Sequence, residues 1–177
     1  IDLAVEQELS LSLPKLLKNS NFIGEEIYAK NPSILKYYLL DNFCWTVDPI
    51  DGTSNFAKSK DRFAVMVALT KNKKILQSFI YKPITEEFMY ADSTATYLDN
   101  KNIKLNKYTE IENSIGSIST KYWDEAKKTK LLAIKDSFRN INSYGSIGCE
   151  YFDIALGKRD FALLSRLHPW DHIPGVF

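Results

Sequence analysis

The stretch WTVDPIDGTSNF, residues 45–56, carries the clearest structural signal in the chain. The apolar residues of 43–47 predict a β-strand, which we expect to stop at Asp48-Pro49. Pro49 restricts the backbone and lacks an N–H donor, so the turn that follows is stiff. Gly52 lets the backbone approach a ligand closely, because it has no side chain. The stretch therefore predicts a strand that delivers polar groups into a rigid turn.

Two carboxylates, Asp48 and Asp51, stand three residues apart in this turn. Carboxylate and carbonyl oxygens are the ligands that Mg²⁺ prefers. Thr53 and Ser54 are typical of a helix N-cap, and the amides at a helix N-terminus can bind phosphate. A lone D-x-x-D pair is more often an Asx-turn before a capped helix. The complete string favours a combined metal and phosphate site instead.

Two other acidic segments follow the ends of predicted elements. Glu25 and Glu26 come directly after the apolar residues of 22–24, and Asp171 follows Trp170. Taken alone, the glutamate pair would be a solvated loop and Asp171 a helix cap. Three carboxylate segments at such ends can converge on shared cations, and we expect them to form one cluster.

Composition narrows the classes of protein to consider. The chain has 177 residues, of which 45% are hydrophobic and 25% charged, as in ordinary globular domains. Its 23 basic and 22 acidic residues leave a net charge of +1, so bulk charge favours neither a nucleic acid nor a membrane as partner. No apolar run approaches the ~20 residues of a membrane span, and no signal peptide is visible. We therefore expect a cytoplasmic protein.

The two cysteines, Cys44 and Cys149, do not form a C-x-x-C pair, which argues against a zinc site. We expect two reduced thiols in the core, while a disulfide between them stays an open alternative.

The chain starts at Ile1, at the beginning of an expected helix, and ends at Phe177, just after the first turn of another. We expect further segments on both sides.

The remaining pattern predicts a layered α+β and α/β architecture. Strands are expected at 21–24, 43–47, 63–70, 75–81, 87–91, 114–119, 140–144 and 160–164. Helices are expected at 2–13 (ended or bent by Pro14), 34–40, 124–138, 149–156 and from about Asp171. Residues 1–113 would form an α+β half with an antiparallel sheet, and residues 114–177 an α/β half, together one compact unit with sheets between helices.

These segments together resemble the inositol monophosphatase family, part of the lithium-sensitive, Mg²⁺-dependent phosphatase superfamily. Residues 45–58 match the first signature of the family, and FIGEE at 22–26 is similar to its G-E-E element. Asp2 is similar to the aspartate of the T-x-x-D helix, and Trp170-Asp171 to the second signature. Gly145-Ser146 with residues 157–160 is similar to the G-S…G-x-x-D stretch. The resemblance implies an αβαβα sandwich of the sugar-phosphatase type.

The resemblance also implies a role for individual residues. Metal ligands for two or three Mg²⁺ ions would be Glu25, Asp48, the Ile50 carbonyl, Asp51 and Asp171. Thr53, with Asp2 and Glu25, would orient and deprotonate the attacking water, and the Gly52 and Thr53 amides would bind phosphate. Substrate contacts would come from Asp51, Gly148, Cys149, Glu150 and Asp171. The implied reaction is direct in-line attack of water on a phosphomonoester, without a phosphoenzyme or a catalytic histidine.

The sequence departs from the family pattern at several positions. Ile173 and Pro174 stand where the family has small residues, and we expect Ile173 to crowd the metal loop. Leu164 stands where members selective for inositol carry an acidic residue, and it cannot hold a substrate hydroxyl. Glu150 is a candidate replacement for that acceptor. These departures favour a small polyol or sugar phosphate other than inositol monophosphate.

Three functions stay open at this point. The first is a phosphatase for a small sugar or polyol phosphate. Members of the resembled family are often homodimers, so a homodimer is expected here as well. The second keeps the metal site but acts on fructose-1,6-bisphosphate, histidinol phosphate or a 3′-phosphonucleotide. The third is a non-catalytic protein that binds a phosphorylated ligand. A haloacid-dehalogenase-type phosphatase is disfavoured, because its nucleophile lies in D-x-D and Asp48 and Asp51 are one residue further apart.

Overall fold

The computed structural model describes residues 1–105 and 108–177, and two β-sheets form its frame. The larger sheet has the strand order β1-β2-β3-β4-β5-β6-β7 and the smaller one the order β10-β8-β9. In the larger sheet β1 is parallel to β2 and the other neighbours are antiparallel, whereas the smaller sheet is entirely parallel. The strands are β1 Asn21–Gly24, β2 Phe43–Asp51, β3 Ala64–Lys71, β4 Lys74–Lys82, β5 Glu87–Asp92, β6 Thr96–Leu98, β7 Lys101–Ile103, β8 Ile115–Ile118, β9 Asn140–Ile141 and β10 Phe161–Leu163.

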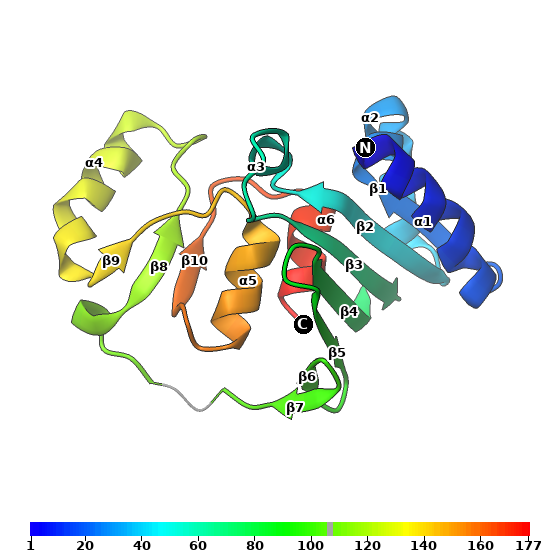
Figure 1. The fold of residues 1–177 in the computed structure, drawn as a ribbon. Coiled ribbons are helices and arrows are strands. Elements are labelled where there is room, and N and C mark those ends of the chain that lie inside the picture. The colour runs from blue at the N-terminus through cyan, green and yellow to red at the C-terminus, as the bar shows by residue number, and fades with distance from the viewer. Residues whose placement is uncertain (106–107) are drawn as a thin grey trace.

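The helices form layers around these sheets. Figure 1 shows α5 between the two sheets, α1 on the outer side of the larger sheet and α4 on the outer side of the smaller one. This is the layered αβαβα sandwich that the sequence predicts. The α-helices are α1 Asp2–Leu16, α2 Glu25–Lys30, α3 Thr53–Ala57, α4 Glu125–Ile134, α5 Ile147–Ala155 and α6 Pro169–His172; 3₁₀ turns lie at Pro32–Leu39, Ile111–Asn113, Lys135–Ser137 and Ile173–Gly175.

Two buried clusters hold the layers together. One lies between the larger sheet and α5 and contains Ala64, Met66, Ile80, Met89, Cys149 and Phe152. The other packs Ile23, Ile34, Cys44 and Trp170 around β1 and β2. Both cysteines are buried and free, so the reduced core thiols expected from the sequence are confirmed. Among the helices of residues 1–105 and 108–177, none has the length and apolar composition of a membrane span.

Strand β2 differs from its prediction in a way that matters for the site. It does not stop at Asp48-Pro49 but continues to Asp51, paired with β3 on both sides of a register shift between Asp48 and Asp51. A bulge of this kind leaves room for Pro49, which cannot donate to the ladder. The two carboxylates therefore lie on an irregular strand end rather than in a free loop.

Other element boundaries also differ. Helix α1 continues through Pro14 to Leu16, because a proline in the last turn removes only one hydrogen bond before the helix ends. The short strands β6 and β7 were not predicted. Between them Asp99 and Asn100 have φ of 46° and 66°, a left-handed turn that suits a tight hairpin.

Candidate metal centre

Asp48 and Asp51 are held at the end of β2 by different donors. Asp48 is 2% exposed, and its Oδ1 accepts a hydrogen bond of 3.1 Å from the Ile50 amide. Asp51 is 8% exposed and accepts from the Ser146 hydroxyl at 2.5 Å and from the Ile147 and Gly148 amides at 3.0 and 2.7 Å. Asp51 therefore joins the first sheet to the start of α5, where the helix dipole favours a negative charge.

Glu25 reaches the same edge of the sheet by a separate route. It is the first residue of α2 and directly follows β1, whose last residue, Gly24, lies opposite Val47 of the parallel strand β2. Glu6 of α1 anchors this corner, because its carboxylate accepts hydrogen bonds from the Glu26 and Ile27 amides at 2.9 and 2.8 Å. Glu6 is 1% exposed, and through these two hydrogen bonds it fixes the position of the α2 N-terminus.

Asp171 comes to the centre from the C-terminal part of the chain. Its Oδ2 accepts a hydrogen bond of 2.9 Å from the His168 amide, which fixes the first turn of α6. The neighbouring Trp170 is 1% exposed and lies against the Tyr28 ring at 4.9 Å. Packing of this tryptophan against the first half of the chain thus brings Asp171 close to β2.

The pKa values of all four acids are raised, first by burial and for three of them also by the charge of a neighbouring acid. Burial, followed by the nearby charge of Asp171, raises the pKa of Glu25 to about 7. Burial raises the pKa of Asp48 well above its ordinary value, and the charges of Asp51, Glu25 and Asp171 add to the rise. Burial also raises the pKa of Asp51 to about 6 and raises that of Asp171. The acidic segments therefore lie close enough for their charges to act on one another, while their joint use as metal ligands stays a prediction.

The cluster fits a divalent cation by charge and by donor type. Within residues 1–105 and 108–177, none of the four acids forms a salt bridge with lysine or arginine. Of the four, Asp48 and Asp51 are buried, Asp171 is partly buried and Glu25 is exposed. A buried carboxylate without a cationic partner is costly unless a metal ion compensates it, and Mg²⁺ takes oxygen ligands of this kind. In the described part of the chain, however, no three His, Cys, Asp or Glu side chains already stand as a closed set of metal ligands. Instead, the carboxylates of Asp51 and Asp171 accept hydrogen bonds from groups of the protein.

The remaining predicted groups surround these acids. Asp2 lies close enough to Glu25 for its charge to raise the pKa of that residue. The Thr53 hydroxyl donates to the Ile50 carbonyl at 3.0 Å and does not cap the helix. Gly52, with φ of 88°, is the N-cap of α3, so the prediction of Thr53 and Ser54 as the cap is wrong by one to two residues. The left-handed backbone at this position suits glycine.

A cavity of about 360 Å³ opens beside the acidic cluster. Its wall is built from the three loops that follow the parallel strands β8, β9 and β10, joined by Asp51 from β2. Loops at the carboxyl ends of parallel strands are a common place for ligands. The lining residues are Asp51, Ser119, Lys121, Tyr122, Ser143, Gly145, Ser146, Ile147, Glu150, Leu164, Arg166, Leu167, His168 and Asp171.

Of the predicted substrate-binding residues on α5, two face the protein core and one lines the cavity. Cys149 packs in the core, and a Cβ on Gly148 would meet the Met66 sulfur at 2.8 Å, so both face inward and neither lines this cavity. Helix α5 also begins two residues earlier than expected, at Ile147. Glu150 does line the cavity, but its carboxylate accepts hydrogen bonds from two serine hydroxyls, those of Ser117 and Ser143, and from the Tyr144 amide.

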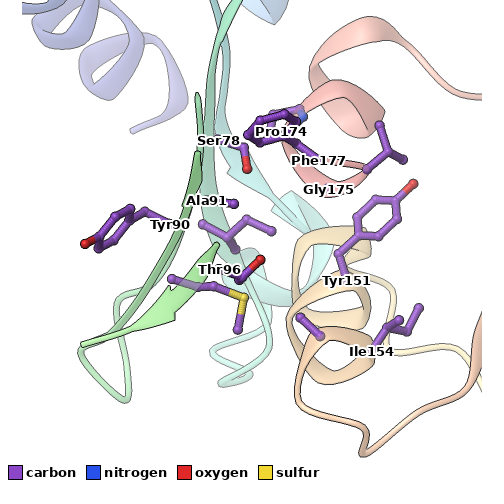
Figure 2. A pocket seen from close by; sticks show the side chains of 13 residues that line it. Ser78, Tyr90, Ala91, Thr96, Tyr151, Ile154, Pro174, Gly175 and Phe177 are labelled. Atoms are coloured by element: carbon purple, nitrogen blue, oxygen red, sulfur yellow. The ribbon is translucent and has the colours of Figure 1, made fainter. Parts of the chain in front are cut away.

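A second cavity, shown in Figure 2, has a different character. It lies between the larger sheet, α5 and the C-terminal residues, and has a volume of about 230 Å³. Its lining contains no acidic, basic or histidine side chain. This second cavity therefore offers no charged side chain or histidine as a ligand for a metal ion.

Sequence reasoning missed several groups of the site. Glu6 could have been noticed, because it lies one helical turn after Asp2 on the same face of α1. The role of Ser146, which holds Asp51 across the two halves, depends on a contact between residues 95 positions apart. Lys121 and Arg166 gave no signal, because single basic residues in loops are common on any protein surface.

Known proteins match this architecture. The sequence model of the inositol monophosphatase family matches residues 1–177. The inositol-1-monophosphatase of Bacillus subtilis (strain 168) is 29% identical over 158 residues, which cover 87% of this chain and 60% of that protein. This chain therefore spans about three fifths of the length of that relative.

Solved structures share the fold. The crystal structure of SaIMPase-II with inositol monophosphate bound superposes with a TM-score of 0.85 at 23% identity, covering 99% of this chain and 67% of that one. A structure of an IMPase/NADP phosphatase with Mg²⁺ and phosphate superposes with a TM-score of 0.84 at 19% identity, covering 98% and 64%. These matches confirm the predicted sandwich.

Proposed function

This chain belongs to the inositol monophosphatase family, and on that premise we propose that it is a Mg²⁺-dependent phosphomonoesterase for a small polyol or sugar phosphate. The observation that supports the proposal is the proximity of Glu25, Asp48, Asp51 and Asp171, all with raised pKa values, at a cavity lined by Asp51 and Asp171. Within residues 1–105 and 108–177 none of the four forms a salt bridge with lysine or arginine. The relative named above is an inositol-1-monophosphatase, and one structural neighbour holds Mg²⁺ and phosphate. Both facts support the same chemistry here.

The metal ions would be held by Glu25, Asp48, the Ile50 carbonyl, Asp51 and Asp171. When bound, Mg²⁺ lowers the pKa of a water molecule and neutralises charge on phosphoryl oxygens. For this role Asp51 and Asp171 would exchange part of their present hydrogen bonding for the ion. The anchoring of Asp51 by three donors of the α5 N-terminus keeps its carboxylate oriented during that exchange.

Thr53, together with Asp2 and Glu25, would orient and deprotonate the attacking water. The Thr53 hydroxyl already donates its proton to the Ile50 carbonyl, which leaves its oxygen free to accept a hydrogen bond from water. Glu25, with a pKa of about 7 before any ion binds, is suited to take up a proton near neutral pH. The amides of Gly52 and Thr53, at the start of α3, would bind the phosphate.

The cavity volume of about 360 Å³ fits a small phosphorylated metabolite. Leu164 in its wall offers no acceptor for a substrate hydroxyl, and the Glu150 carboxylate is already used by three protein donors. These two observations favour a substrate other than inositol monophosphate. Sensitivity to Li⁺, a homodimer and a cytoplasmic location stay predictions.

The test is release of phosphate from a panel of phosphomonoesters with Mg²⁺, with and without Li⁺. We expect turnover that needs Mg²⁺, is inhibited by Li⁺ and falls by at least about a hundredfold in Asp48→Asn. Asp124→Asn is the matched control, because Asp124 is an exposed acid at the N-cap of α4 that pairs with Lys127. Binding of phosphoesters without turnover of any of them would instead support a non-catalytic phospholigand-binding protein.

A further inference from the structure

Two neighbouring loops, those that follow β8 and β10, build part of the wall of the cavity that contains Asp51. Strands β8 and β10 are parallel neighbours whose last residues, Ile118 and Leu163, lie opposite each other. The Ser119 amide donates to the Leu163 carbonyl at 2.8 Å, and the Ser119 and Ser165 hydroxyls are 3.5 Å apart. The two loops therefore leave the sheet side by side and face the same cavity.

Each of these loops carries one cation into the cavity lining. The Lys121 ammonium lies 5.3 Å from the centre of the Tyr122 ring, and the Arg166 guanidinium lies 5.1 Å from the centre of the same ring. Both cations therefore contact the same aromatic ring, which attracts each of them. Within residues 1–105 and 108–177, neither cation forms a salt bridge with an acidic side chain.

From this geometry we infer that Lys121, Tyr122 and Arg166 form a subsite for a second anionic group of the substrate. The inference rests on the proposed phosphatase function, in which one phosphoryl group occupies the metal end of the cavity beside Asp51 and Asp171. The preferred substrate is then a phosphomonoester that also carries a second phosphate or a carboxylate.

Other features of the cavity support a second anion over a neutral polyol. Leu164, on the same loop as Arg166, contributes an apolar surface. The Glu150 carboxylate, the predicted alternative acceptor for a substrate hydroxyl, is 2% exposed and already accepts three hydrogen bonds. Besides hydroxyl groups and His168, the lining offers Lys121 and Arg166 to the distal part of a substrate. Guanidinium and ammonium groups bind phosphate and carboxylate through charge-assisted hydrogen bonds.

The experiment compares substrate pairs that differ only in the second anion. The pairs are glucose 1,6-bisphosphate with glucose 1-phosphate, and 2-phosphoglycerate with glycerol 2-phosphate. For each pair the ratio of kcat/KM values is measured with Mg²⁺ in the wild type, in Arg166→Gln and in Lys121→Gln. Lys74→Gln is the control, because it removes the same charge from an exposed position at the far end of β4.

We expect the wild type to prefer the member with two anions by about tenfold or more, and each variant to lose most of that preference. The preference should also shrink at high salt, since both cations are exposed. A preference in the first pair alone identifies a second phosphate, and a preference in both pairs extends the subsite to carboxylates. A wild type without preference, or variants whose ratio equals that of the wild type, would overturn the inference.

Failure of the phosphatase proposal can be told apart from failure of this inference. If no member of either pair is hydrolysed, the proposed function fails. The subsite is then judged from calorimetric affinities of glucose 1,6-bisphosphate and glucose 1-phosphate in the presence of Ca²⁺. A preference for the bisphosphate that Arg166→Gln abolishes would support the subsite, and equal affinities would exclude it.

Discussion

Lowering the pH from about 8 to about 5 is expected to weaken Mg²⁺ binding by at least about tenfold, because protons compete for the carboxylates. Asp51 has a pKa of about 6 in the ion-free protein. Near pH 5 about nine tenths of this group is protonated, and freeing it for the ion costs about 1.4 kcal/mol, a factor of about ten. Glu25, with a pKa of about 7, adds to the loss by an amount that its solvent exposure reduces.

The same shift fixes the sign of the effect on stability. The pKa of Asp51 rises from 3.8 to about 6 on folding, so the folded ion-free protein binds this proton more tightly than the unfolded chain. Its stability therefore falls as the pH rises from about 4 to about 6, by about 3 kcal/mol from this residue. A bound cation removes that loss, so Mg²⁺ should raise the thermal midpoint more at pH 8 than at pH 5.

Isothermal titration with MgCl₂ at both pH values measures the affinity directly. Titrations near pH 6 in two buffers of different ionisation enthalpy measure the protons released on binding, and we expect a net release. Asp124→Asn should behave as the wild type, because Asp124 is exposed and lies on α4. The reasoning is refuted if the affinity agrees within about twofold at the two pH values and no proton is released.

Three further variants test the structure around the site. Gly24→Ala should lower the free energy of unfolding by about 1–3 kcal/mol in urea, since its Cβ would lie 2.4 Å from the Glu6 carboxyl carbon; an unchanged midpoint would contradict this contact. Glu150→Ala should cost about 3 kcal/mol and Glu150→Gln about 1 kcal/mol, because alanine leaves the Tyr144 amide and two hydroxyls unpaired; equal losses would argue against the network. Asp48→Asn should raise the thermal midpoint of the ion-free protein at pH 8 while reducing the gain from Mg²⁺; a lower midpoint without Mg²⁺ would show that Asp48 is not an uncompensated charge.

Local sequence determined the elements that local interactions can form. The antiparallel strands β3, β4 and β5 were predicted nearly at their observed bounds, because alternating apolar residues between turn residues suffice to define them. The segment of residues 45–56 likewise predicted a strand followed by a rigid turn that contains two carboxylates and a glycine. Short elements with weak patterns, such as β6 and β7, escaped prediction because their pairing depends on strands already in place.

For the site, too, the identity of the residues could be predicted from the sequence, whereas their proximity could not. The acid residues Glu25, Asp48, Asp51 and Asp171 could be named from the sequence, because carboxylates at the ends of apolar runs are a chemical signal. Their proximity, and the use of Glu6 and Ser146 as anchors, depends on contacts between residues far apart in the chain, which no local pattern contains.

Tertiary structure alone decided which side chains share the cavity. Lys121 and Arg166 are 45 positions apart and become neighbours only because β8 and β10 are adjacent parallel strands. Sequence by itself thus determined the chemistry that the chain can offer, since this depends on residue type and local spacing. The packing of the two sheets around α5 decided where that chemistry meets, because burial and strand pairing act between distant segments.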